Sequence, residues 1–134
     1  MTTRDANLVE IRPALALETE AANALDLFES QTLRPILSLQ NQVMLTLLSY
    51  YLKKYCPRFS QFDHARRIAY VSDMLHRDSR PKNMIVGMVA GHFTEEEFAF
   101  FVEQEPEVRR CLIDLCIVSL QDQVDQLCSD APSA

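Results

Sequence analysis

Hydrophobic residues recur every three or four positions through most of this chain, which is the spacing of one face of an α-helix. No stretch shows the alternation of a strand, and the chain holds only 2 glycines, whereas antiparallel sheets need glycine-bearing turns every few residues. The pattern therefore predicts an all-α fold, a single-domain bundle of about five to six helices covering residues 1–134. Residues 1–20 are expected to form an arm or short helix, and residues 129–134 a frayed tail.

The longest predicted helix, about residues 33–55, is the central element of the bundle. It begins with Thr32 as a plausible N-cap and Pro35 in the first turn, where a missing N–H costs nothing. Its polar positions form only a thin stripe: Ser38, Gln42, Thr46, Ser49 and Lys53. A helix this apolar must be covered on several sides, by the rest of the fold or by a second subunit, and this favours a homodimer.

Two helices are expected between the central helix and the glycines. The first follows Pro57, with Ser60 and Asp63 resembling a capping box, and buries a stripe of Phe62, Ala65, Ile68, Ala69, Met74 and Leu75. The second begins with Ser79 as N-cap and Pro81 in its first turn, and it ends at Gly91.

The stretch "GMVAGHFTEEEF", residues 87–98, contains both glycines and reads as a helix end followed by a helix start. Thr94 is the predicted N-cap, Glu97 closes its capping box, and Phe93 packs on Phe98 as a hydrophobic staple. Gly91 follows the last predicted turn of its helix, where glycine is the residue that most often ends an α-helix. Gly87 costs about 1 kcal/mol relative to alanine inside a helix, so we expect a neighbouring helix, a ligand or a partner chain to approach its backbone closely.

The last predicted helix runs from Pro106 to about residue 128. Its middle, "CLIDLCIVSL", is broad and apolar, so it should pair with the central helix. With 134 residues the chain has room for one buried core without a metal or disulfide.

The net charge of −6 argues against general nucleic-acid binding, although residues 53–82 carry eight basic and three acidic side chains. A helix-turn-helix over residues 63–91 is disfavoured because its second helix is too apolar for a major groove. We expect the basic segment to be a solvated face or to meet the acidic regions within the fold or across a dimer. An acidic partner is the alternative. The N-terminus lacks a secretory signal and no apolar run reaches a membrane span, so a cytoplasmic location is expected.

His92, beside Gly91, is the most conspicuous candidate for chemistry. A metal there needs further ligands, and the chain contains no E-x-x-H motif and no C-x-x-C pair. The four cysteines are expected to be reduced and to fill the core. Nucleophile elbows and phosphate-binding glycine loops do not occur. We therefore assign no catalytic residue, metal or cofactor. The polar residues near the distinctive motifs that could contact a ligand or partner are Arg34, Gln40, Asn41, His76, Gly87 and His92.

Three segments together resemble a family of small bacterial proteins of unknown function: "TLRPILSLQNQ" (32–42), "GMVAGHFTEEEF" (87–98) and "RRCLIDLCIVSLQDQ" (109–123). Some members of this family carry the label glyoxalase. The two known glyoxalase architectures need either paired βαβββ modules or a T-H-x-H-x-D-H signature, and this chain shows neither. The resemblance therefore implies a helical fold without transferable catalytic residues.

Two functions from different classes follow. The chain is either a non-enzymatic interaction or regulatory protein that dimerises through its broad apolar helices and offers a surface to a protein partner, or a small-molecule-binding protein or enzyme. The second function predicts a pocket that gathers His92, Arg34, Gln40, Asn41 and His76.

Overall fold

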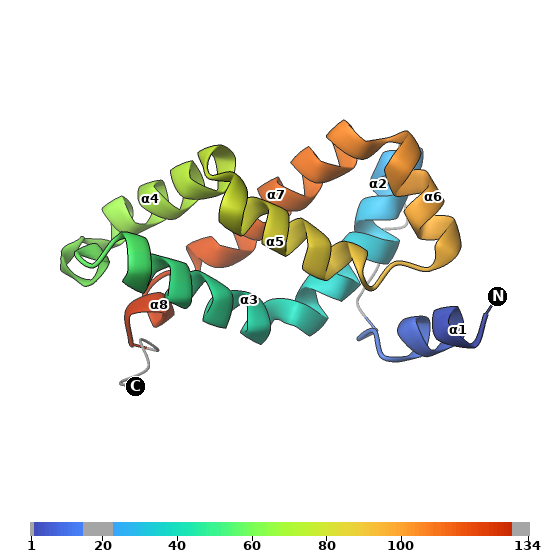
Figure 1. The fold of residues 1–134 in the computed structure, drawn as a ribbon, viewed down its shortest axis with the longest axis horizontal. Coiled ribbons are helices and arrows are strands. Elements are labelled where there is room, and N and C mark those ends of the chain that lie inside the picture. The colour runs from blue at the N-terminus through green and yellow to red at the C-terminus, as the bar shows by residue number, and fades with distance from the viewer. Residues whose placement is uncertain (1, 15–22, 130–134) are drawn as a thin grey trace. The chain divides into compact units, whose positions relative to one another are not determined.

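The computed structural model describes residues 2–14 and 23–129, and within them every regular element is helical, which confirms the all-α prediction. The elements, drawn in Figure 1, are α1 (Thr3–Glu10), α2 (Ala24–Phe28), a π-helical turn (Glu29–Leu33), α3 (Arg34–Tyr55), a 3-10 turn (Phe59–Gln61), α4 (His64–Arg77), α5 (Ser79–Ala90), α6 (Glu95–Glu103), α7 (Glu105–Gln121) and α8 (Gln126–Ser129). The predicted tail lies mostly outside the described residues, as does the end of the predicted arm. None of the helices described is long and apolar enough to cross a membrane.

Contacts divide the chain into two compact units. The first combines residues 1–40 with residues 86–112, and the second combines residues 41–85 with residues 113–134. The boundary falls inside α3, α5 and α7, so each of these helices contributes to both units. Buried side chains of the first unit include Leu33, Ile36, Val89, Phe93, Val108 and Leu112, and those of the second include Leu48, Val71, Leu75, Ile85, Cys116 and Leu120.

In the first unit, aromatic rings join α2 to α6. The ring of Phe28 stacks on Phe100 with centroids 4.7 Å apart and meets the edge of Phe93 at 5.4 Å. Figure 1 shows α2 and α6 side by side accordingly. Such pairs add about 0.5–1.5 kcal/mol beyond the burial of their area. This packing holds the turn before α6 in place.

In the second unit, the basic residues of α4 face carboxylates from the end of the chain. Arg67 and His64 contact the two carboxylate oxygens of Asp125 at 2.8 and 3.0 Å, and His76 lies 3.5 Å from Asp114. Part of the basic segment 53–82 therefore meets acidic residues of its own chain, as expected from the charge pattern.

Three predicted caps are wrong. Thr32 does not cap α3, because the chain is helical from Ala24 through Tyr55 and Thr32 lies in the π-helical turn. This wider turn ends two residues before Pro35, whose ring nitrogen cannot donate within a helix. Asp63 rather than Ser60 caps α4 by accepting from the Arg66 N–H. At α5, Asp78 rather than Ser79 accepts from the backbone of Arg80, because a carboxylate is the stronger acceptor at a helix N-terminus.

The predicted buried stripe of α4 is only partly correct. Leu75 is buried and Ile68 is half-buried, but Val71 is buried as well, while Ala65 and Ala69 are exposed. Alanine contributes little apolar area, so larger side chains decide which face turns inward.

The last predicted helix, residues 106–128, is broken. Helix α7 begins at Glu105 but ends at Gln121, and a turn precedes α8. Within that turn the Gln123 amide donates to the Ser119 carbonyl and exchanges two hydrogen bonds with Asn41, each of 2.9 Å. These side-chain bonds replace helical backbone bonds at the end of α7.

Candidate functional site

The turn between α5 and α6 confirms the helix end and helix start expected from "GHFTEEEF". Helix α5 ends at Ala90, and the Thr94 hydroxyl accepts from the Glu97 N–H while the Glu97 carboxylate accepts from the Thr94 N–H, which completes the capping box. The rings of Phe93 and Phe98 meet with centroids 6.5 Å apart, as the staple requires. Local sequence alone is enough to specify this turn.

The two glycines behave differently from what the sequence suggested. Gly87 is exposed, and a Cβ placed on it would meet nothing within 4 Å, so the expected close approach to its backbone does not occur. Gly91 follows the last helical residue but does not adopt a positive φ. It therefore ends α5 without the left-handed geometry of the usual glycine stop.

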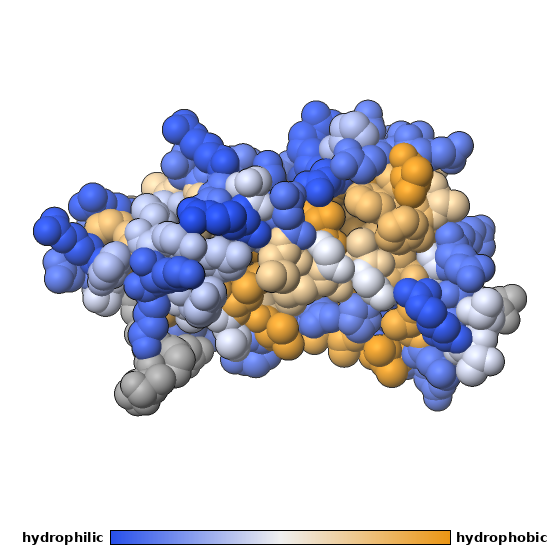
Figure 2. All heavy atoms as spheres, in the orientation of Figure 1, coloured by the Kyte–Doolittle hydropathy of each residue, from blue (hydrophilic) through white to orange (hydrophobic). Residues whose placement is uncertain are grey.

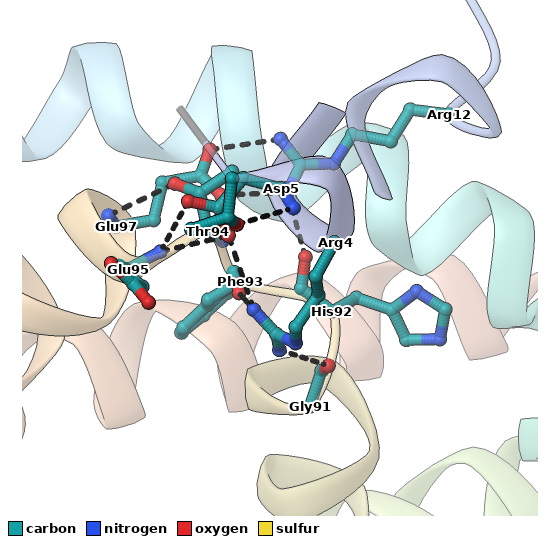
Figure 3. A network of polar contacts seen from close by, with 10 residues as sticks. Arg4, Asp5, Arg12, Gly91, His92, Phe93, Thr94, Glu95 and Glu97 are labelled. Atoms are coloured by element: carbon teal, nitrogen blue, oxygen red, sulfur yellow. Dashed lines mark hydrogen bonds and ion pairs between the residues drawn. The ribbon is translucent and has the colours of Figure 1, made fainter. Parts of the chain in front are cut away.

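The N-terminal arm, residues 2–14, binds this turn through three charged residues, and the first two are Arg4 and Asp5. Arg4 donates to the carbonyls of Phe93 and Gly91 at 3.0 and 3.2 Å, and the buried Asp5 carboxylate accepts from the Glu95 N–H at 3.2 and 3.3 Å. Asp5 thereby satisfies a free N–H in the first turn of α6, where negative charge is favoured. Figure 3 shows both side chains directed at the turn.

Arg12 forms the centre of the network. Its guanidinium donates two hydrogen bonds of 2.8 and 2.6 Å to the Glu97 carboxylate and a third, of 2.8 Å, to the His92 carbonyl. Thr32 adds a fourth donor to Glu97 at 2.8 Å. Burial alone would raise the pKa of Glu97, but the hydrogen bonds from Arg12, the Thr94 backbone and Thr32 outweigh it and lower that pKa. Glu97 is therefore fully ionised at neutral pH.

The His92 imidazole points away from this ion pair, as Figure 3 shows. Burial, together with the positive charges of Arg12 and Arg4, lowers the pKa of His92, so the ring is neutral at pH 7. The Gln40 side-chain amide is hydrogen-bonded to Nε2 of the ring, and Nδ1 is buried without a partner. Nε2 is therefore occupied by Gln40, and Nδ1 is closed to solvent.

The remaining chemistry-bearing residues form no reactive cluster in the parts described. Residues 2–14 and 23–129 contain no group of three His, Cys, Asp or Glu side chains able to hold a metal ion. Cys56, Cys111 and Cys116 form no disulfide among the described residues, and burial raises the pKa of Cys116 to about 12, which keeps it protonated and unreactive.

Of the sequence candidates, the structure brings together Gln40 and His92. Arg34 instead makes an exposed ion pair with Glu29 at 3.3 Å. Asn41 is engaged by Gln123, and His76 is exposed beside Asp114. The arm residues Arg4, Asp5 and Arg12 and the π-turn residue Thr32 were not identified from sequence, because no local pattern links them to a turn more than 60 positions away.

A second feature is the exposed face of α3. No charged residue occurs between Arg34 and Lys53, a run that covers most of this helix. In that run Val43 and Tyr50 are 54% and 56% exposed, and Leu39, Gln42 and Thr46 on the same side of the helix are exposed as well. Hereafter these five residues are the α3 face. Where α3 runs in Figure 1, Figure 2 shows orange and pale side chains together with blue ones.

No family model, curated protein or solved structure matches this chain.

Proposed function

We propose that this protein is a non-enzymatic interaction protein that forms a homodimer through the α3 face. The observation that carries the proposal is the exposed, uncharged run of the longest helix. Exposed helix faces normally carry Lys, Glu, Arg or Asp, whereas the cores of protein interfaces are depleted of charge and enriched in aromatic residues. Val43 and Tyr50 fit the second description.

A second copy of the chain is the partner that the charges favour. Each copy carries a net charge of −6, so two copies repel one another overall. A two-fold dimer places the same patch of each copy against the other, and an uncharged patch meets itself without repulsion. The contact should consequently resist salt, because it contains no ion pair to be screened and the remaining repulsion weakens as salt is added.

The proposed function also accords with the network around Glu97. The polar groups that could have formed a catalytic site there are bound by the chain's own arm, and the His92 ring is bonded to Gln40. The competing function, a small-molecule site or enzyme near residues 87–98, has one supporting observation, the meeting of Gln40 and His92.

Sedimentation velocity over a range from low micromolar to hundreds of micromolar protein tests the proposal. We expect a concentration-dependent dimer whose association is unchanged or stronger in high salt. A strict monomer throughout that range would contradict it, and so would a dimer that salt dissociates.

A further inference from the structure

The second unit carries a group of exposed aromatic and basic side chains where the end of α3 meets the start of α5. The Arg80 guanidinium lies 3.9 Å from the ring centroid of Tyr55, and Lys54 Nζ lies 5.4 Å from the same centroid. All three side chains are exposed. Hereafter Lys54, Tyr55 and Arg80 are the cationic patch. Where α3 ends and α5 begins in Figure 1, Figure 2 shows dark-blue and pale-blue side chains at the surface.

The chain itself holds the cationic patch in a defined arrangement. Arg80 donates from Nε and Nη2 to the two carboxylate oxygens of Asp78 at 3.0 and 2.8 Å, while its guanidinium lies over the Tyr55 ring in a favourable cation–π geometry. Tyr55 in turn stacks on Tyr51 with ring centroids 5.8 Å apart. Side chains that are ordered in advance lose less conformational entropy when a partner binds. The patch is therefore preorganised for a contact.

The charge around the patch is opposite to that of the chain as a whole. Residues 50–58 and 78–84 contain five basic side chains and one acidic one, whereas the whole chain carries −6. Within the described residues, Lys54 forms no ion pair with a carboxylate. A guanidinium has five N–H donors, so Arg80 can serve a second carboxylate while it stays bonded to Asp78. The patch thus offers positive charge to an anionic partner.

An acidic protein segment suits this patch better than a nucleic acid does. Tyrosine and arginine are among the residues most enriched at the energetic centres of protein interfaces. The Tyr55 ring already contacts Tyr51 and Arg80, so it is a poor platform for stacking a base. Phosphates repeat along a strand, and beyond the patch they would meet a chain whose other charges are predominantly negative. A short acidic segment stays within the positive region, because salt screens charges beyond about 8–10 Å.

We propose that the cationic patch binds a short acidic segment of another protein, with one carboxylate on Lys54 and a second on Arg80. Both contacts are charge-assisted hydrogen bonds, which are roughly twice as strong as bonds between neutral groups. None of the three patch residues belongs to the α3 face, so the proposal goes beyond the homodimer and does not depend on it.

Hexaglutamate and hexaglutamine, which have the same length and differ in charge, test the patch. We would titrate each into the ¹⁵N-labelled protein and follow the backbone amides of residues 54, 55 and 80. At low salt, hexaglutamate should shift these amides with a dissociation constant below about 1 mM, and hexaglutamine should leave them unchanged. Binding should weaken as salt is added, because the attraction is between exposed charges.

Two double variants, each of which removes two positive charges from the basic segment 53–82, identify the cations that bind. Lys54→Gln combined with Arg80→Gln should weaken hexaglutamate binding at least tenfold, as expected for the loss of two charge-assisted hydrogen bonds. Arg66→Gln combined with Arg77→Gln is the matched control, because both arginines are exposed on α4 outside the patch. It should weaken binding by less than about threefold, through the change in net charge alone.

Three outcomes would overturn the proposal in variants whose amide spectra show a retained fold. If hexaglutamate shifts none of the three patch amides at millimolar concentration, the patch binds no acidic segment. Equal losses in the two double variants would show that affinity follows net charge and not the patch. A ten-nucleotide oligothymidylate that binds more tightly than hexaglutamate would assign the surface to nucleic acid. A strict monomer in sedimentation would contradict the homodimer and leave these expectations unchanged.

Discussion

Arg12 and Glu97, 85 positions apart, form a bidentate ion pair, and their side chains are only 8% and 18% exposed. The pair links the N-terminal arm to the first turn of α6 and shares its carboxylate with the capping box. Because the pKa of Glu97 lies below its ordinary 4.5 in the folded protein, the pair contributes stability above that pH. This stability is lost as the pH falls through the folded pKa.

Removing the guanidinium from this pair should destabilise the protein strongly. In Arg12→Ala, Glu97 keeps its charge in a largely buried position, so we expect the free energy of unfolding to fall by about 2–4 kcal/mol. The matched control is Arg34→Ala, which breaks the exposed pair with Glu29 and should cost less than about 1 kcal/mol. Urea denaturation at neutral pH measures both, and equal losses would contradict the structural role given to Arg12.

Stability should fall as the pH decreases through the range where an unfolded histidine titrates. The folded pKa of His92 lies below its ordinary 6.5, so the unfolded chain binds a proton first. Protonation therefore favours unfolding from about pH 7 downward until the folded pKa is reached. His92→Gln removes this contribution and should flatten the dependence of the free energy of unfolding between about pH 7 and pH 5. An NMR titration that finds the folded His92 pKa at or above 6.5 would refute the prediction.

The two glycines should respond differently to alanine. Gly87→Ala places a methyl group in open space on α5 and should raise the free energy of unfolding by about 1 kcal/mol, the difference in helix propensity. In Gly91→Ala the new Cβ would lie 3.2 Å from the Gly87 carbonyl oxygen, so the gain should be smaller or become a loss. Thermal unfolding of both variants checks the order. A destabilised Gly87→Ala would show that something covers α5 at that point in solution.

Charge on the α3 face should abolish the proposed dimer. Val43→Asp and Tyr50→Asp each introduce a charge that a two-fold contact would place near its own copy, so dimerisation should weaken by at least tenfold, with the fold retained. Val118→Asp on α7 is the control, since Val118 is even more exposed, at 63%. If Val118→Asp dissociates the dimer while the α3 variants do not, the interface lies elsewhere.

Local rules in the sequence predicted much of the fold. The helical period placed α3 and α5 within a residue or two of their ends, and "FTEEEF" predicted the start of α6 together with its capping box and staple. These features depend on residues within a few positions of one another, so a short stretch of sequence contains all the groups that interact. Where two polar residues compete for one cap, as Asp78 and Ser79 do, the window leaves the choice open. A short window also leaves open which face of α4 is buried, because it does not show whether the alanines or the larger apolar residues turn inward.

The tertiary structure alone decided which distant groups meet. Several contacts depend on how segments far apart in the sequence pack, and a single sequence contains no record of that packing. These contacts pair Arg12 and Thr32 with Glu97, Gln40 with His92, and Asn41 with Gln123. The same holds for the open space around Gly87 and for the exposure of Val43 and Tyr50. Sequence by itself thus determined that the chain forms apolar helices with defined ends. Packing determined which faces they bury, because burial is a property of all the neighbours together rather than of one helix.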